Sequence, residues 1–317
     1  MAASEFELIR LFFSAATRQR SDVLLGIGDD CALLQVPPGH TIAVSVDTLV
    51  AGRHFLPDVD PEALGHKALA VNLSDLAAMG ATPAWLTLAI TLPESDLDWL
   101  GAFMRGFAGL AERHGVQLVG GDTTRGPLSI TVQAHGLLPL GRGLRRSGAR
   151  PGDRLFVSGT LGDAALALRH RYTGSVAEAL QARLDRPTPR VALGLLLRDL
   201  ATAAIDVSDG LHADLGHLCA ASDVAARVML SQLPLSPTVR QVCNAGEWQF
   251  PLAGGDDYEL LFSVAPDRIA DLQAACRAIN EPIQQIGELH QGEGITLIYP
   301  DGRESRETPQ GYDHFKN

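Results

Sequence analysis

The chain has 317 residues, of which 46% are hydrophobic and 20% charged, and its formal net charge is −11 at pH 7. This composition is ordinary for a globular protein of about two domains, and the acidic balance argues against a nucleic-acid partner, because such partners favour a basic surface. Lys67 and Lys316 are the only lysines. Neither stands in a P-loop or in the strand motif of protein kinases, so both of these enzyme classes are excluded.

The amino-terminal sequence and the cysteines indicate an intracellular protein that does not enter a membrane. Glu5 and Glu7 stand where a signal peptide would carry bases, and no apolar run reaches the roughly 18 residues of a membrane-spanning helix. The four cysteines lie far apart and form no Cys-x-x-Cys motif. We therefore expect reduced, mostly buried thiols and a cytoplasmic location.

Hydrophobic periodicity predicts alternating helices and strands in the first half of the chain. Helices are expected over residues 5–19, 60–79 and 94–114. In the second of these, Asp60 can cap the amino end, Pro61 suits the first helical position and Gly80 stops the helix. Strands are expected over residues 23–27, 42–46, 85–91, 116–119 and 129–138.

A turn-forming stretch at residues 147–153 marks the expected boundary between an N-terminal domain (1–148) and a C-terminal domain (149–317). Beyond it the pattern predicts strands over 155–158, 204–207, 258–264 and 295–299. Helices are expected from about residue 161, after residue 210 to about 221, and over 267–278. Strands mixed with helices in both halves predict two α+β domains.

Acidic residues recur at the expected ends of strands, beside small residues. They are Asp29, Asp30, Asp47, Asp122, Asp206 and Asp209. Side chains at such positions reach a surface cleft rather than a core. Asp75 differs, because it interrupts the apolar helical run 68–79 on the same face as Asn72 and Met79, and a polar group on a buried helix needs a partner.

If these carboxylates converge, they need cations, because two carboxylates about 4 Å apart repel by about 4 kcal/mol at an effective dielectric constant near 20. An all-oxygen ligand set without EF-hand spacing favours Mg²⁺ or Mn²⁺ over Ca²⁺. Gly28, Gly121 and Gly210 beside the acids allow the backbone to approach a ligand closely, and Arg145 and Arg146 can bind phosphate. The pattern therefore predicts a site for metal ions and a phosphate-bearing ligand.

Each member of this pattern also has an ordinary structural interpretation. A Gly-Asp pair is usually a turn, and Asp209 can be the N-cap of the following helix. The Arg145–Arg146 pair can be solvated, and a lone histidine such as His54 can be structural. The repetition of acids at strand ends, rather than any one of them, favours the metal–phosphate interpretation.

Eight segments carry these residues in order: GIGDDCALL (26–34), SVDTLVAGRHF (45–55), KALAVNLSDLAAMGATPAWLTLAITLP (67–93), GGDTTRGPLSITV (120–132), RSGARPGD (146–153), AIDVSDGL (204–211), LAGGDDYELLF (252–262) and GYDHF (311–315). They resemble the thiamine-monophosphate kinases, a family related to the aminoimidazole ribonucleotide and selenophosphate synthetases. The resemblance implies an aminoimidazole ribonucleotide synthetase-like fold. Its N-terminal α/β domain has a mixed sheet, binds ATP and metal, and pairs in a homodimer. Its C-terminal α+β domain completes the substrate cleft.

The resemblance also implies roles for individual residues. The implied ligands of several Mg²⁺ ions are Asp30, Ser45, the carbonyl of Val46, Asp47, Asp75, Asp122, Asp206 and Asp209, of which Asp30, Asp75 and Asp122 are expected to carry catalysis. The implied ATP contacts are Gly121, Asp122, Arg146 and Ser208. The implied contacts to thiamine monophosphate are His54, Asp257 and Tyr312. The family often has glutamate where Asp256 stands, which makes Asp257 the stronger candidate.

The implied reaction is transfer of the γ-phosphoryl group of ATP to thiamine monophosphate, giving thiamine diphosphate and ADP. The second pKa of a phosphate monoester is near 6, so the acceptor oxygen is mostly anionic at pH 7 and needs no general base. Metal ions would neutralise charge and hold the reacting groups in line. We expect direct transfer without a phosphoenzyme.

Other interpretations stay open at this point. Selenophosphate synthesis would need a cysteine and a lysine before the first acidic motif, and residues 1–30 contain neither. A ring-closing synthetase matches the C-terminal segments less well. A non-catalytic metal- or nucleotide-binding module would explain the acids but not a separate set in His54, Asp257 and Tyr312, although Tyr312 can also be a tail residue that packs on its own domain.

Overall fold

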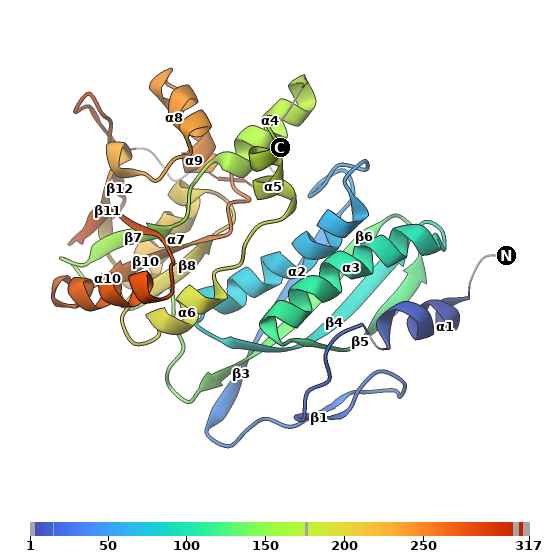
Figure 1. The fold of residues 1–317 in the computed structure, drawn as a ribbon. Coiled ribbons are helices and arrows are strands. Elements are labelled where there is room, and N and C mark those ends of the chain that lie inside the picture. Colours follow the sequence, from blue (N-terminus) through green and yellow to red (C-terminus); the bar gives the residue numbers. More distant parts are fainter. Residues whose placement is uncertain (1–3, 15, 175–176, 307–310, 313–317) are drawn as a thin grey trace. The chain divides into compact units, whose positions relative to one another are not determined.

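The computed structural model describes residues 4–14, 16–174, 177–306 and 311–312 (Figure 1). The chain divides into two compact units. Unit 1 comprises Met1–Leu76 and Ala81–Gly141, and unit 2 comprises Ala77–Gly80 and Arg142–Asn317. Each unit is built on a sheet of its own.

A mixed four-stranded sheet forms the centre of unit 1, in the order β3–β6–β4–β5, with only the β4–β5 pair parallel. Its strands are β3 (His40–Val50), β4 (Thr82–Leu92), β5 (Gln117–Arg125) and β6 (Ser129–Pro139), beside a hairpin of β1 (Val23–Leu25) and β2 (Leu33–Leu34). The helices are α1 (Glu5–Leu8), the π-helix η1 (Ile9–Phe13), α2 (Pro61–Ala78) and α3 (Leu97–His114). Helices α2 and α3 lie side by side over one face of the sheet (Figure 1).

Two glycines allow α2 and α3 to pack this closely. A Cβ atom on Gly65 would lie 1.9 Å from the carbonyl oxygen of Phe103, and one on Gly106 would lie 1.8 Å from the carbonyl oxygen of Glu62. The obstacle is main chain in both cases, so it cannot move aside as a side chain could. The crossing therefore requires glycine at both positions.

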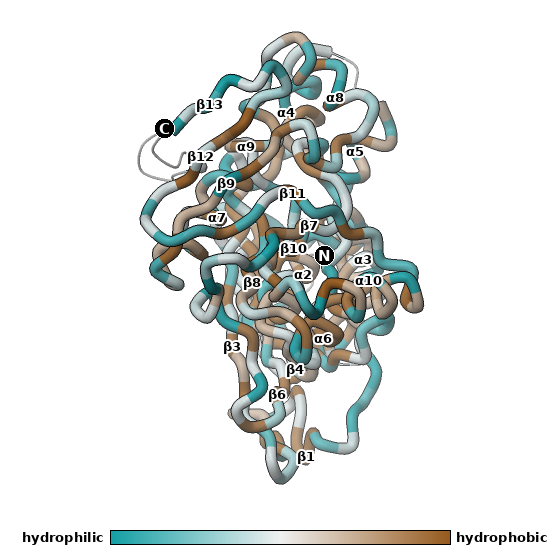
Figure 2. Tube along the Cα trace, turned by 90° about the vertical axis from the view of Figure 1, so that its left-hand side faces the viewer, coloured by the Kyte–Doolittle hydropathy of each residue, from teal (hydrophilic) through white to brown (hydrophobic). Residues whose placement is uncertain are grey.

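A seven-stranded sheet forms the centre of unit 2, in the order β13–β12–β9–β11–β7–β10–β8, with only the β12–β9 pair parallel. Its strands are β7 (Arg154–Ser158), β8 (Ala203–Val207), β9 (Ala225–Met229), β10 (Glu259–Val264), β11 (Ile283–His290), β12 (Ile295–Ile298) and β13 (Glu304–Ser305). Every residue of β8 and β10 is buried. By contrast, β13 lies in a hydrophilic stretch (Figure 2).

The helices of unit 2 are mostly short. They are α4 (Asp163–Thr173), α5 (Glu178–Asp185), α6 (Val191–Leu197), α7 (Leu211–Ser222), α8 (Pro237–Asn244), α9 (Gln249–Ala253) and α10 (Ile269–Ala278), with 3-10 turns η2 (Leu230–Gln232) and η3 (Pro266–Arg268). Among the residues that the structure describes, no helix of either unit is long and apolar enough to span a bilayer.

Several sequence-based predictions are confirmed by this architecture. Unit 1 has the expected mixed sheet, and unit 2 combines strands and helices as an α+β domain does. The expected helix over 60–79 is α2, and Asp60 caps it by accepting hydrogen bonds from the N–H groups of Glu62 and Ala63 at 3.3 and 3.2 Å. The expected helix over 94–114 is α3, which ends at Gly115 in the left-handed conformation.

Three predictions about the first half are wrong. The helix over 5–19 ends at Phe13: α1 passes into the π-helix η1, whose last bond runs from the N–H of Ser14 to the carbonyl of Ile9, five residues back. The strand over 42–46 extends across His40–Val50, so Asp47 lies within β3 rather than at its end. The strand over 116–119 likewise continues as β5 to Arg125 and contains Asp122.

Candidate active site

A pair of carboxylates links strand β3 to helix α2 in unit 1. Ser45 and Asp47 are two residues apart on β3 and share one face of the sheet. Asp75 on α2 accepts a hydrogen bond from Ser45 Oγ and shares another with Asp47. Burial, together with the neighbouring Asp75, raises the pKa of Asp47 to about 6. The carboxylates of Asp47 and Asp75 therefore lie close enough to repel each other, and a cation between them would relieve that repulsion.

A cavity of about 500 Å³ lies along β5, the strand at the opposite edge of the sheet. Its lining brings together Asp30, Gly121 and Asp122, three of the predicted site residues, with Asp29 beside them. Its apolar wall comes from Phe6, Ile9 and Phe13, in α1 and η1. A Cβ atom on Gly121 would lie 1.9 Å from the carbonyl oxygen of Leu88, so only glycine fits there.

The β3–α2 carboxylates and the β5 cavity are separate groups within unit 1. Asp47 pairs with Val132 on β6, Val132 with Leu88 on β4, and Leu88 with Gly121 on β5. Three spacings of about 4.8 Å place Asp47 and Gly121 roughly 14 Å apart. Within the described residues of unit 1, these acids therefore form two groups.

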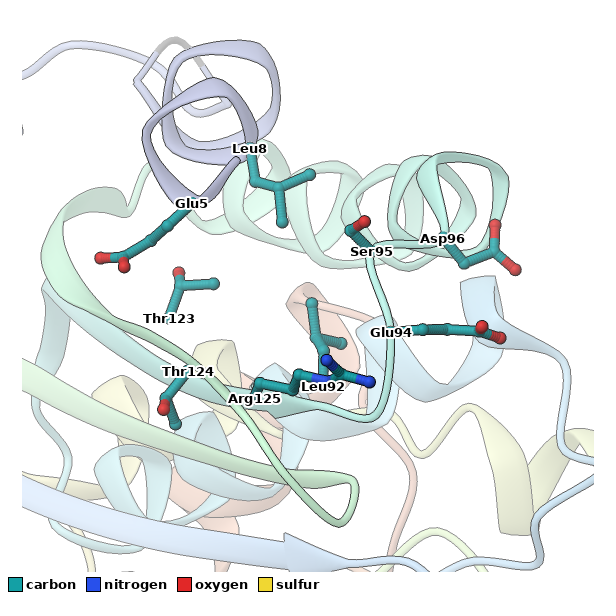
Figure 3. A pocket seen from close by; sticks show the side chains of 9 residues that line it. All are labelled: Glu5, Leu8, Leu92, Glu94, Ser95, Asp96, Thr123, Thr124 and Arg125. Atoms are coloured by element: carbon teal, nitrogen blue, oxygen red, sulfur yellow. The ribbon is translucent and has the colours of Figure 1, made fainter. Parts of the chain in front are cut away.

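A second cavity, of about 670 Å³, continues along β5 and shares Thr123 with the first. Figure 3 shows Leu8 reaching toward it from α1, opposite Leu92 and Arg125 of the sheet. Arg125 Nε donates a hydrogen bond to the carbonyl of Pro93 at 3.2 Å. None of the predicted site residues lines this second cavity.

The predicted residues of unit 2 gather where β8 ends and α7 begins. Asp206 is buried within β8, and Ser208 and Asp209 follow the strand. The N–H groups of Ser208 and Asp209 both donate to Asp214 Oδ2 at 3.0 Å. Asp209 is not the N-cap of α7, because that position belongs to Gly210. Burial and the charge of Asp209 raise the pKa of Asp214 to about 7.

Two further segments of unit 2 lie against this turn. The N–H of Asp256 donates to the carbonyl of Ser208 at 2.8 Å, and the N–H of Tyr312 donates to the carbonyl of Asp209 at 3.3 Å. Tyr312 is partly exposed. Residues 313–315 of the last resembling segment lie outside the described residues. The structure thus brings Ser208, Asp209 and Tyr312 together.

Asp257 is buried beside the same turn. Both of its carboxylate oxygens accept hydrogen bonds from the N–H of Gly162, at 2.9 Å, where α4 begins. Burial raises the pKa of Asp257 well above its usual value. Its side chain therefore faces the interior of unit 2, whereas Asp256 beside it is only half-buried.

Three predicted residues remain: Arg146, His54 and Val46. Arg146 is exposed, and its carbonyl accepts a hydrogen bond from Ser222 Oγ at 2.8 Å. His54 Nδ1 accepts a hydrogen bond from the N–H of Val50 at 2.9 Å, so a neutral His54 carries its proton on Nε2. Val46 is 56% exposed on the face of β3 opposite Asp47.

Sequence reasoning missed several charged residues of unit 2. Asp214 could have been found as an acid in the first turn of the helix that directly follows Asp209. Glu259 opens the apolar strand β10 and is fully buried. Arg183 binds it from α5 and Arg190 from the position just before α6, two segments that the hydrophobic pattern left unassigned. In the sequence, each of these arginines stands in a partly apolar run, and that is the one sign that its side chain could be buried.

The donor atoms fit a hard cation in their chemistry. Ser45, Asp47 and Asp75 offer only oxygens, and the carboxylates of Asp47 and Asp75 interact closely enough for Asp75 to raise the pKa of Asp47. Within the described ranges, no group of three or more histidine, cysteine, aspartate or glutamate side chains is placed to hold a metal ion. Each acidic group is therefore a partial ligand set.

Comparison with known proteins defines the class. The family model for the N-terminal domain of AIR synthase related protein matches residues 28–138, and the model for the C-terminal domain matches residues 150–300. The chain therefore has the two-domain architecture of AIR synthase related proteins. A solved structure of the hydrogenase maturation protein HypE in complex with ATP, at 21% identity and a TM-score of 0.82, shares this fold and covers 99% of this chain and 96% of its own.

More similar relatives identify one family within that class. The chain is 50% identical to the thiamine-monophosphate kinase of Escherichia coli K12 over 99% of both chains, and 42% identical to that of Haemophilus influenzae over 100% of this chain and 99% of the other. A solved thiamine-monophosphate kinase from Stenotrophomonas maltophilia K279a has a TM-score of 0.88 at 48% identity and covers 96% of this chain and 99% of its own. A complex described as AaThiL with AMPPCP and TMP has a TM-score of 0.77 at 33% identity, over 88% and 89%. The chain belongs to the thiamine-monophosphate kinase family, as its sequence motifs predicted.

Proposed function

We propose that this chain is an ATP-dependent phosphotransferase that converts thiamine monophosphate and ATP to thiamine diphosphate and ADP. The observation that carries the proposal is the full-length identity of 50% to a thiamine-monophosphate kinase. The acidic groups on β3, α2 and β5 and after β8 supply the ligand chemistry that such a reaction needs.

The reaction needs positioning and charge neutralisation more than proton transfer. The acceptor phosphate has a second pKa near 6 and is largely a dianion at pH 7. Direct in-line attack on the γ-phosphorus therefore needs no side chain as base, and no phosphoenzyme is proposed. The main obstacle is repulsion between the two phosphate groups, which positive charge and fixed N–H donors reduce.

The proposed Mg²⁺ ligands fall into three groups by position. They are Ser45, the carbonyl of Val46, Asp47 and Asp75 at the β3–α2 carboxylates; Asp30 and Asp122 in the β5 cavity; and Asp206 and Asp209 after β8. When bound, Mg²⁺ would supply Lewis-acid neutralisation of phosphate charge. Asp30, Asp75 and Asp122 are the residues whose loss is expected to affect catalysis most.

The proposed substrate contacts use the remaining residues. Gly121, Asp122, Arg146 and Ser208 are assigned to ATP. His54, Asp257 and Tyr312 are assigned to thiamine monophosphate, and Asp257, whose side chain is buried, is proposed to act through the segment 255–258 around it. The aromatic ring of Tyr312 suits the cationic thiazolium of thiamine.

A product assay tests the reaction. Purified chain, ATP, Mg²⁺ and thiamine monophosphate are incubated, and thiamine diphosphate is measured after oxidation to its fluorescent derivative. Product that disappears when EDTA is added, and returns with excess Mg²⁺, is expected. A folded chain that binds Mg²⁺-ATP but forms no thiamine diphosphate would refute the assignment.

We also propose that the chain acts as a homodimer with shared sites. Strand β3 is an edge of its sheet and exposes Ile42, Val44 and Val46 on one face, at 40%, 56% and 56%. A row of exposed aliphatic side chains on an edge strand favours pairing with a second copy. Since Asp47 and Asp122 lie on the two opposite edge strands of one sheet, a second copy is proposed to bring the two groups to one ligand.

Mixing inactive variants tests this arrangement. In mixed dimers of Asp47→Asn and Asp122→Asn chains, one of the two shared sites is intact, so random mixing should restore roughly a quarter of wild-type activity. Asp47→Asn mixed with Asp75→Asn is the matched control, because both defects lie in the same group and no intact site forms. Equal, negligible recovery in the two mixtures would refute shared sites.

The proposed compartment is the cytoplasm. The substrate ATP is abundant there, and thiols stay reduced. All four cysteines of this chain are free, and three of them are buried.

A further inference from the structure

A buried cluster of charged side chains lies beside the segment 255–258 in unit 2. The carboxylate of Glu259 is fully buried at the start of β10. Its Oε1 accepts hydrogen bonds from Arg183 and from Arg190, both at 2.8 Å. Its Oε2 accepts from Arg190 Nε at 2.7 Å and from Ser158 Oγ at 2.5 Å. Four donors on two oxygens leave this carboxylate no freedom to turn.

The two arginines have different further contacts. Arg190 continues to Glu281 at 3.2 Å and so links β10 to the loop before β11. Arg183, on α5, uses the same terminal nitrogen that binds Glu259 to reach the carbonyls of Thr160 at 3.1 Å and Asp257 at 3.4 Å. Arg183 alone of the two therefore joins the turn before α4 to the segment 255–258.

The turn before α4 packs closely against Glu259 and Arg190. A Cβ atom on Gly159 would lie 2.0 Å from Glu259 Oε1 and 2.6 Å from a terminal nitrogen of Arg190. Three residues later, the N–H of Gly162 holds both carboxylate oxygens of Asp257. The turn and the segment thus meet twice, once through Arg183 and once through Asp257.

The segment 255–258 contains two non-glycine residues with strained backbone conformations. Asp256 and Tyr258, on either side of Asp257, have φ angles of +63° and +49°, in the left-handed region that side chains rarely adopt. Their N–H groups donate to the carbonyls of Ser208 and Val207, both at 2.8 Å. Such strain persists only where the surroundings fix it, and it is concentrated at functional segments.

We propose that Arg183 is a positioning residue for thiamine monophosphate: its guanidinium, bridging Glu259, Thr160 and Asp257, holds the segment 255–258 in its strained, substrate-binding conformation. This inference rests on the proposed function, in which that segment contacts the acceptor. It assigns Arg183 no contact with ATP. Lysine cannot replace it, because its side chain is one heavy atom shorter, and its ammonium on a flexible stem is not held at the position from which this one guanidinium nitrogen reaches all three acceptors.

The test compares Arg183→Lys with Arg190→Lys. Both variants keep the positive charge on Glu259 and loosen the same cluster, but only Arg183→Lys removes a bridge to Thr160 and Asp257. We expect Arg183→Lys to raise the KM for thiamine monophosphate roughly tenfold with the KM for ATP unchanged. Arg190→Lys should lower the melting temperature as much or more, with both KM values near wild type.

The outcomes separate the two proposals. If the wild-type chain forms no thiamine diphosphate, the proposed function fails. If the wild type is active but the two variants change KM equally, or Arg183→Lys raises the KM for both substrates alike, the positioning role is overturned.

A second measurement applies if Arg183→Lys does not fold. In the wild type, thiamine monophosphate should slow amide hydrogen exchange in peptides that contain Tyr258 and Thr160, whereas ATP alone should not slow it there. Exchange in those peptides that is indifferent to thiamine monophosphate would overturn the inference.

Discussion

The crossing of α2 and α3 makes a sharp prediction about two glycines on the same helix. Gly106 faces α2, where an added Cβ would lie 1.8 Å from the carbonyl oxygen of Glu62, whereas Gly109 is exposed with nothing within 4 Å. Alanine at either position gains about 1 kcal/mol in helix propensity. At Gly106 this gain is outweighed, because overpacking against main chain costs about 3 kcal/mol.

The net expectation is that Gly106→Ala destabilises unit 1 by about 2 kcal/mol while Gly109→Ala stabilises it by about 1 kcal/mol. For a unit of this size, the Gly106→Ala loss corresponds to a melting temperature lower by roughly 6–8 °C. Trp85 and Trp99 lie in unit 1, and Trp99 stacks on Phe103 at the crossing, with ring centroids 5.4 Å apart. Urea unfolding followed by tryptophan fluorescence in a Trp248→Phe background therefore reports on unit 1.

The reasoning depends on the difference between the two sites, since the chemical change is identical. Stability changes of the same sign and size for Gly106→Ala and Gly109→Ala would refute it. Gly65→Ala is a second check from the other side of the crossing, because its Cβ would meet the carbonyl oxygen of Phe103 at 1.9 Å. Gly65→Ala should destabilise unit 1 by about as much as Gly106→Ala does.

Three further predictions concern the site, the dimer and pH. Asp75→Asn keeps an acceptor for Ser45 Oγ, so we expect an unchanged circular dichroism spectrum and turnover reduced about 100-fold or more; normal turnover would exclude the role given to Asp75. Val44→Arg places a charge on the exposed face of β3 and should convert a dimer to an inactive monomer in light scattering, while a wild-type monomer would end the dimer proposal. Because burial raises the pKa of Asp257 in the folded chain above the value of 3.8 that it has when exposed, the folded state holds a proton that the unfolded state releases. The stability contributed by Asp257 is therefore complete below pH 3.8 and is lost as the pH rises toward the folded pKa, by up to about 1.4 kcal/mol per pH unit. Asp257→Asn should flatten the decline of the urea midpoint above pH 4, and an identical decline in both proteins would contradict the shift.

Local signals predicted the helices that unit 1 places on its sheet. Asp60, Pro61 and Gly115 act within a few residues of themselves, and the structure uses each as the sequence indicated. The end of β5 could not be found in this way. Gly120 and Gly121 are typical of a strand end, but pairing with β4 carries the strand through them, with a register shift beside Gly120.

The sequence supplies candidate site residues but does not show how they group in space. The motifs name Asp47, Asp75 and Asp122, yet whether two acids meet depends on strand order, which places β6 and β4 between β3 and β5. The cluster around Glu259 was missed for a related reason. Its partner Arg183 is 76 residues away in the sequence, and no periodic pattern relates the two.

The strand order of unit 2 also bears on how the chain folds during synthesis. Strand β7 is the first strand of unit 2 to be synthesised, but its partners in the sheet are β10 and β11. It therefore stays unpaired while roughly a hundred further residues are added, which takes about 5–20 s at the usual rate of translation. Unit 1 has its complete sheet once β6 has emerged from the ribosome. Unit 2 is therefore the part of the nascent chain that exposes unpaired apolar strands longest. Chaperones would be expected to engage it there, and truncation before β10 would leave β7 without either of its partners.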